Sequence, residues 1–169
     1  MTVYSVDKLI AEARRLAADY RRATGKSLAG VGSEIADYDA ARLLDLELVT
    51  DRSEGYDAVG RGEREGKRIQ IKGRAIFDEA KSGQRIGQIK AEQVWDRVVL
   101  VLMDEEFEPF ELYEAEREDV VQAVEDAAAS RRSKRGALSV AKFKRIARLV
   151  WTREEGLISD EIWDNQTGG

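Results

Sequence analysis

The sequence predicts an α/β fold, in which a central mixed β-sheet of about four or five strands is flanked by about four helices. Residues 98–103 form a continuous aliphatic run, which is typical of a strand buried on both faces. Residues 68–74 alternate between apolar and polar side chains, as on a half-buried strand. The chain has 169 residues, the size of one ordinary domain, so we expect a single domain over 1–169 with a frayed tail at 165–169.

A first helix is predicted over residues 6–24, because Ser5 can cap its first turn and Gly25 follows its last. Its outer face should carry Arg14, Arg15, Arg21 and Arg22, directed to solvent or to a nucleic-acid backbone. The residues expected on its buried side are Leu9, Ile10, Ala13, Leu16, Ala17 and Tyr20.

A second helix is predicted from about Val31 to Leu48. Glu34 lies in its first turn, where a carboxylate complements the helix dipole and contributes ~0.3 to 1 kcal/mol. A functional role for Glu34 is the alternative, and it depends on the hairpin that follows. The residues expected on the buried side are Val31, Ile35, Tyr38, Ala41, Leu44 and Leu48.

Residues 49–50 can begin an edge strand, and residues 55–74 then read as a hairpin with a glycine-rich turn. The irregular pattern of residues 75–90 predicts a mobile loop beside it. The run at 98–103 should occupy the centre of the sheet and pair with a strand around residues 110–113.

The remaining chain predicts two more helices. Residues 120–127 should form a helix with an acidic outer side, followed by a basic loop at 131–136. Ser139 can then cap a last helix that runs to Trp151 and carries Lys142 and Arg145 away from the core.

Composition restricts the chemistry. The sequence contains no Cys and no His, which excludes thiol nucleophiles, zinc sites built on these residues and any imidazole base. A hydrolase made from this chain would have to use carboxylates, lysine and a metal. The longest aliphatic run is too short to span a bilayer, so we expect no membrane partner and a cytoplasmic protein.

The charges are segregated along the chain although the net charge is only −5. Residues 104–126 contain eleven acids and one arginine, whereas residues 131–148 contain eight basic residues and no acid. Such segregation can make one face attractive to phosphates despite the negative total.

The hairpin carries the reactive groups. Because side chains alternate on a strand, Gln70, Lys72 and Arg74 should share its polar face. If the two pieces pair, Asp57 on the first piece approaches them, and its carboxylate can hold a divalent metal against a phosphate. The simpler interpretation is that these residues form only the solvated side of the hairpin. Gly73 favours the functional one, because a glycine lets a backbone or a phosphate approach closely.

Asp57 followed by Gln70 and Lys72 resembles the PD-(D/E)XK nuclease superfamily, whose fold is called restriction-endonuclease-like. The resemblance covers residues 30–116 and is closest to a small single-domain branch with a Q-x-K motif. The pattern differs at two positions: Tyr56 replaces the usual proline, and Gln70 replaces the second acid. The second change removes a negative charge from the metal site, although an amide oxygen can still coordinate.

The resemblance implies a metal-dependent nuclease that hydrolyses phosphodiester bonds of nucleic acid, with DNA as the expected substrate. It implies that Mg²⁺ or Mn²⁺ is held by Asp57, Gln70, the Ile71 carbonyl and Glu34, while Lys72 orients or deprotonates the attacking water. The nucleic-acid contacts expected alongside are Arg74, Arg85, Lys142 and Arg145. Cleavage of both strands would favour a homodimer.

Two alternatives stay open at this point. The chain can be a catalytically inactive module with the nuclease fold that binds nucleic acid or a protein. It can also be a structural partner in a larger complex, docking through the acidic segment 104–126.

Overall fold

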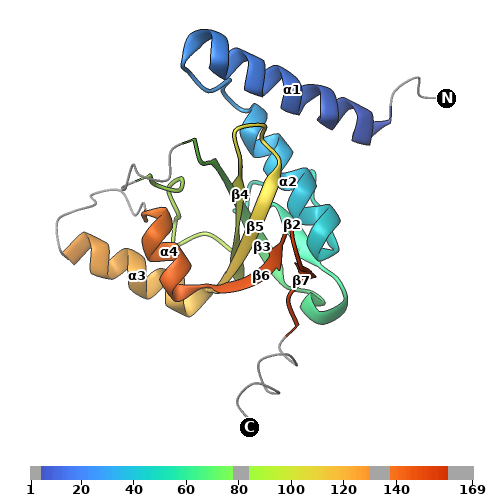
Figure 1. Cartoon of the computed structure of the whole chain (residues 1–169). Coiled ribbons are helices and arrows are strands. Elements are labelled where there is room, and N and C mark those ends of the chain that lie inside the picture. The colour runs from blue at the N-terminus through green and yellow to red at the C-terminus, as the bar shows by residue number, and fades with distance from the viewer. Residues whose placement is uncertain (1–4, 78–83, 130–137, 160–169) are drawn as a thin grey trace, which may run out of the picture.

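The computed structural model describes residues 5–77, 84–129 and 138–159. Its described strands form one sheet in sequence order (Figure 1). In that sheet β3 and β4 are parallel, and the other neighbouring strands are antiparallel. The α/β class is confirmed, but the sheet is larger than predicted. Its seven strands are β1 (Leu46–Leu48), β2 (Ala58–Gly60), β3 (Arg68–Ala75), β4 (Arg97–Met103), β5 (Pro109–Glu116), β6 (Arg148–Thr152) and β7 (Gly156–Leu157).

The described helices lie on both faces of the sheet (Figure 1). The helix α2 (Val31–Leu44) covers one face, with α1 (Val6–Thr24) packed against α2 at one end of the molecule, and α3 (Arg117–Ala129) and α4 (Val140–Ile146) lie on the other face. Because side chains alternate on a strand, Val99 and Val101 of β4 enter the first core while Val98 and Leu100 enter the second. The prediction of a central strand buried on both faces is therefore confirmed.

The second helix ends earlier than predicted. Asp45 adopts a left-handed conformation with φ of 54° and caps α2 after Leu44. The chain then turns into β1, where Leu46 pairs with Gly60 of β2. Residues 49 and 50, the predicted start of the edge strand, follow this strand.

The last helix is also shorter than predicted. Ser139 caps α4 as expected, but the helix ends at Ile146 and Ala147 is extended. Residues 148–152 form β6 on the open edge of β5, which places Trp151 opposite Leu112. The β-branched and aromatic residues here suit a strand, and pairing with β5 outweighs the helical spacing.

The first helix has the predicted ends, but its predicted inward face is only partly confirmed: Ala17 is buried and Ile10 and Ala13 are half-buried, whereas Leu9, Leu16 and Tyr20 are exposed. Ser5 caps its first turn and Gly25 its last, yet its buried residues are Arg14, Ala17 and Ala18. The Arg14 guanidinium binds the buried carboxylate of Asp39 on α2 and donates to the Phe107 carbonyl at 2.7 Å. This polar contact, rather than the most apolar stripe of the helix, fixes how α1 faces the core.

The described part of the segment after β3 is not simply a solvent loop. Ile86 and Ile89 are buried in the second core, and residues 84–86 bond to residues 138–140. The predicted basic loop at 131–136 and the tail at 165–169 lie outside the described residues. Within the described ranges, no helix combines the length and the apolar character needed to cross a membrane.

Candidate functional site

The predicted hairpin brings Asp57 against β3. β2 pairs with β3 at Ala58 and Ile69, and the Asp57 N–H donates to the Ile69 carbonyl at 2.8 Å. The Asp57 side chain then turns toward β3, where its Oδ2 accepts the Ile71 N–H at 2.7 Å. The carboxylate therefore sits at the peptide that lies between the two predicted partners, Gln70 and Lys72.

Gln70 presents an unpaired oxygen in a buried position. The residue is 7% exposed, and its Nε2 donates to the Gly55 carbonyl at 2.9 Å, while its Oε1 has no hydrogen-bond partner in the described part of the chain. The opposite amide orientation would place oxygen against oxygen, so the contact with Gly55 fixes which atom is left. A buried unpaired acceptor costs about 1 to 3 kcal/mol, and a cation would satisfy it.

The carbonyl of Ile71 faces the same edge of β3 as Asp57. On a strand, the N–H and C=O of one residue point to the same side, and the side alternates along the chain. The Ile71 N–H meets Asp57, so the Ile71 carbonyl points to that side too. The described pairing of β2 with β3 ends at Ile69, which leaves this edge free of a strand.

Lys72 lies in a half-buried position on the side of β3 that carries Gln70. Its Nζ donates to the Gln88 carbonyl at 3.1 Å. Burial lowers the pKa of Lys72, and Arg74 lowers it further, whereas the carboxylates of Asp57 and Asp37 raise it. The net pKa is below the ordinary lysine value, so the neutral amine is easier to reach than in a solvated lysine.

The structure adds Asp37, which the sequence reasoning missed. Glu34, the predicted helical carboxylate, is exposed, whereas Asp37 one turn later is 5% exposed and accepts from Arg52 at 2.6 Å. Burial raises the pKa of Asp37 to about 6, opposed by Arg52 and reinforced by Asp57 and Glu34. The sequence contained one signal for this: Asp37 precedes Ala41 by four residues and Leu44 by seven, which places it on the same helix side as these two residues, both predicted to face inward.

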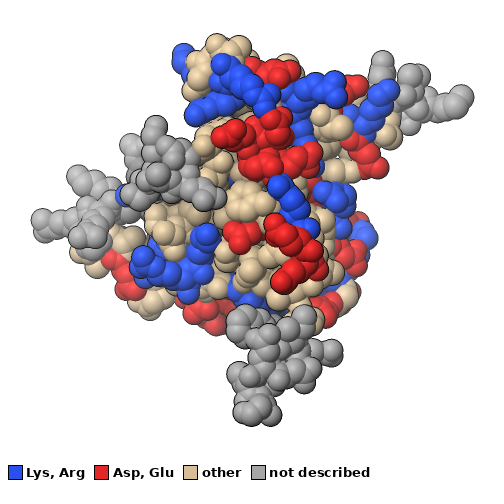
Figure 2. Space-filling model, in the orientation of Figure 1, with Lys and Arg blue, Asp and Glu red and all other residues tan. Residues whose placement is uncertain are grey.

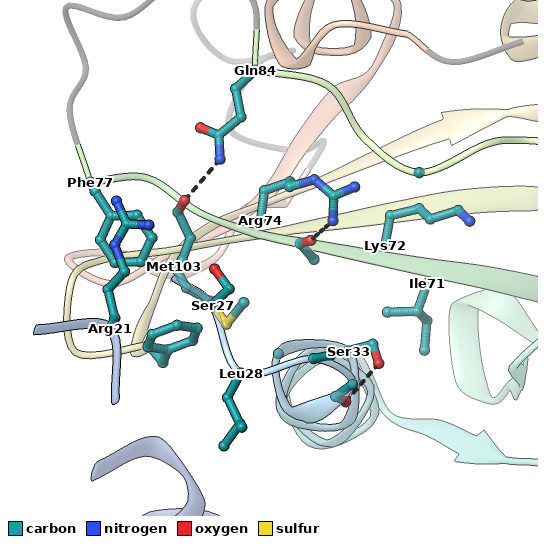
Figure 3. Close-up of a pocket in the computed structure, with 17 residues that line it drawn as sticks. Arg21, Ser27, Leu28, Ser33, Ile71, Lys72, Arg74, Phe77, Gln84 and Met103 are labelled. Atoms are coloured by element: carbon teal, nitrogen blue, oxygen red, sulfur yellow. Dashed lines mark hydrogen bonds between the residues drawn. The ribbon is translucent and has the colours of Figure 1, made fainter. Parts of the chain in front are cut away.

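A pocket of about 830 Å³ opens beside Lys72, between β3 and the first turn of α2. Figure 3 shows Lys72 and Arg74 extended from β3, with Ser33 of α2 and Arg21 of α1 on other walls. Three cationic side chains line this pocket, namely Arg21, Lys72 and Arg74, and its described lining contains no carboxylate. The lining therefore suits an anion.

Other contacts hold two of these cations in place. The Arg21 guanidinium stacks 4.2 Å from the centre of the Phe77 ring. Arg74 donates from Nε to the Arg85 carbonyl at 2.5 Å and from NH1 to the Gly73 carbonyl at 2.7 Å. Burial lowers the pKa of Arg74, which shows that its charge is partly desolvated.

Gly73 has a different neighbour from the one expected. A Cβ at this position would lie 2.4 Å from the Ala36 Cβ, so the glycine lets α2 pack against β3. The close approach predicted for a backbone or a phosphate is made by a helix.

The remaining predicted contacts lie outside this lining. The exposed Arg85 forms a bridge with Ser139, just before α4, and α4 carries Lys142 and Arg145. The Val140 N–H donates to the carbonyl of Gln84, a residue of the pocket lining, at 2.8 Å. Figure 2 shows a group of basic side chains over α4, while acids and bases intermix over α1 and α2.

Across the described residues, no three or more Asp or Glu side chains are grouped so that they could hold a metal ion. The predicted donor set is of another kind, because it combines carboxylates with the amide oxygen of Gln70 and the carbonyl of Ile71. Both donor types are ligands that Mg²⁺ accepts. No family model matches this chain, and a search of curated proteins found no significant match.

Proposed function

We propose that the chain is a metal-dependent nuclease with a restriction-endonuclease-like core. The observation that carries the proposal is the meeting of Asp57 with the Ile71 peptide, between Gln70 and Lys72, beside a pocket whose described lining has cations as its only charged groups. A metal ligand set and a phosphate-binding surface therefore adjoin on one edge of β3.

Asp57, the Gln70 Oε1 and the Ile71 carbonyl would hold Mg²⁺ or Mn²⁺. Glu34, or Asp37 one turn later on α2, would supply a second carboxylate. When bound, the ion polarises the scissile phosphate and lowers the pKa of a coordinated water. The unpaired oxygen of Gln70 supports this fit, because a buried acceptor without a donor is satisfied by a cation.

Lys72 would act on the attacking water. Its ammonium orients that water and offsets charge on the pentacovalent transition state, and its lowered pKa also makes deprotonation of the water by the neutral amine accessible. Arg74 would contact a phosphate, since it is held in the pocket beside Lys72.

A second candidate is a module that keeps this fold and binds nucleic acid without cleaving it. One observation favours it: the Arg52 guanidinium lies 2.6 Å from Asp37 and 3.3 Å from Asp57. It supplies a positive charge where the nuclease would bind its metal. Such a module would keep its affinity in EDTA and would be insensitive to Lys72→Ala.

The experiment is a cleavage assay on supercoiled plasmid, single-stranded DNA and RNA, with Mg²⁺ or Mn²⁺ against EDTA. The proposal expects metal-dependent cutting that Lys72→Ala reduces by about 10² or more, the scale of one positioned catalytic group. Lys67→Ala is the matched control, because it removes an exposed lysine from the turn of the same hairpin. The nuclease proposal fails if wild-type protein cuts none of the three, or if Lys72→Ala cuts as well as Lys67→Ala.

A further inference from the structure

Helix α1 leaves an apolar stripe outside the core. The exposed fractions are 62% for Val6, 46% for Leu9, 57% for Leu16 and 37% for Tyr20. Ala13 lies between them and is half-buried, because it also packs against the edge of the first core. The five residues follow alternating steps of three and four, which place them along one side of the helix. We call them the α1 stripe.

The contacts of α1 with the body prevent the helix from turning to bury the stripe. The helix is held through Arg14, which binds Asp39 and the Phe107 carbonyl on a side about a third of a turn from the middle of the stripe. Rotation would leave the fully buried Asp39 with the exposed Arg42, 3.1 Å away, as its cationic partner, and breaking the buried pair with Arg14 is strongly destabilising. Figure 1 shows α1 lying at one end of the molecule, with its N-terminal half projecting past the sheet.

We propose that the α1 stripe packs against the α1 stripe of a second copy of this chain, with the two helices antiparallel. The charges along one flank of the stripe argue for this occupant. They are Lys8, Glu12, Arg15 and Asp19, all exposed. In an antiparallel pair centred on Ala13 and Arg14, Lys8 lies opposite Asp19 of the second copy and Glu12 lies opposite Arg15.

A parallel pair lacks this complementarity. A twofold axis parallel to the helices would bring the charged flank of one copy against the opposite flank of the other, which carries Ile10 and Ala17 and faces the body of the protein. Only the antiparallel order brings the charged flank against the same flank of the second copy, where opposite charges meet. The flank charges therefore favour an antiparallel pair of identical helices.

This register also brings the apolar side chains near one another. Leu9 lies within two residues of the level of Leu16 of the second copy, and Val6 within one residue of the level of Tyr20, which is at most about 3 Å along the axis. Ala13 meets Ala13 of the second copy near the twofold axis, where a small side chain lets two helix axes approach closely. The contact runs along the helix, which is about 28 Å long.

The first test is the mass of the full chain in solution by sedimentation or light scattering over a range of concentrations. The wild type should approach twice the 19.0 kDa mass of one chain. Leu16→Glu should raise the dimer dissociation constant at least about tenfold, because the stripe then carries a charge into an apolar contact. Leu157→Glu is the control, since Leu157 is 62% exposed on β7 and should leave the dimer intact.

The second test determines the direction of the helices. Because the chain contains no cysteine, every disulfide formed must involve the introduced residues. Leu9→Cys and Leu16→Cys proteins are prepared separately, mixed and mildly oxidised. A disulfide requires Cα atoms about 4.4 to 6.8 Å apart, so the antiparallel pair should give mainly the mixed Leu9→Cys with Leu16→Cys product. Circular dichroism of each variant checks that the fold is retained.

Three results would overturn the proposal. A wild type that stays monomeric at all concentrations assigns the stripe to another protein or to another segment of this chain. A dimer that Leu16→Glu leaves unchanged places the interface elsewhere. Disulfides formed only within each single variant, with no mixed product, make the pair parallel.

Discussion

At the residue scale, the site combines a carboxylate that already has partners with an uncharged buried oxygen that has none. Asp57 accepts two hydrogen bonds, from Ile71 and Arg52, whereas the Oε1 of Gln70 accepts none from the described residues. The two positions would therefore respond differently to the proposed metal. Asp57 would have to exchange its contact with Arg52, while the Gln70 oxygen would gain a partner.

Changing Gln70 to Glu tests this asymmetry through stability. Without metal, the buried carboxylate of Gln70→Glu faces the Gly55 carbonyl, so the variant should melt at a lower temperature than the wild type in EDTA. Mg²⁺ or Mn²⁺, at a concentration about 100 times its dissociation constant, should raise the unfolding free energy of this variant by about 3 kcal/mol. Gln122→Glu, at an exposed position on α3, should show no metal-dependent shift. Equal metal effects in both variants would argue against a site at Gln70.

Asp37 makes stability depend on pH. Its folded pKa of about 6 exceeds the ordinary value of 3.8, so the folded chain binds this proton more tightly than the unfolded chain does. The favourable contribution is complete below about pH 4 and is lost as the pH rises through about 6. Asp37→Asn cannot lose a proton. Relative to the wild type, it should therefore gain up to about 3 kcal/mol of unfolding free energy between about pH 4 and pH 7.

Denaturant unfolding of both proteins across that pH range measures the difference. Glu65→Gln, which removes one acidic side chain at an exposed turn position, is the control. A constant offset between Asp37→Asn and the wild type would show that Asp37 does not titrate in this window.

At the element scale, the packing of α2 on β3 positions the site. The Ala36 side chain fills the space above Gly73, which brings α2, with Asp37 next along the helix, close to the strand that carries Lys72. Gly73→Ala should destabilise the protein by about 1 to 3 kcal/mol, since the added methyl overlaps Ala36 at 2.4 Å. Adding Ala36→Gly should recover part of that loss in thermal unfolding. Additive losses in the double variant would show that the two positions do not share this contact.

Elements with local signals are predictable, and those decided by distant partners are not. The ends of α1 follow from Ser5 and Gly25, which act within one turn. The orientation of α1 depends on Asp39, which lies 25 residues from Arg14, and sequence spacing does not indicate that pair. Likewise, residues 148–152 form β6 because β5 has a free edge with which they can pair. The helical spacing of their apolar residues does not indicate that edge.

The same distinction applies within the candidate site. The period of two places Gln70, Lys72 and Arg74 on one side of a strand, and the glycines indicate the hairpin to β2. Asp37 and Arg52 reach the site only because α2 and the turn before β2 pack against it. Their contacts depend on tertiary structure, which the local sequence pattern does not indicate. Of Glu34 and Asp37, it is Asp37, on the buried side of α2, that lies near Asp57 through their shared contact with Arg52.

At the scale of the whole molecule, the charge segregation of the sequence is reduced in space. Acids of the segment 104–116 pair with basic residues from distant parts of the chain. These pairs are Asp104 with Arg153, Glu106 with Arg22, Glu108 with Arg14, Glu111 with Lys144, and Glu114 with Arg64, Arg97 and Arg148. This half of the acidic segment is thus largely neutralised, while the pocket beside Lys72 keeps a cationic lining.

The salt dependence of DNA binding should therefore separate two possible phosphate-binding surfaces. Removing one cation that binds a phosphate makes the slope of log affinity against log salt shallower by about 0.9 on duplex DNA. Arg21→Ala with Arg74→Ala should reduce the slope by up to about twice that amount, because both line the pocket. Lys142→Ala with Arg145→Ala tests the α4 surface in the same way. Binding titrations in EDTA exclude cleavage, and an unchanged slope for the pocket pair beside a reduced slope for the α4 pair would place the phosphates on α4.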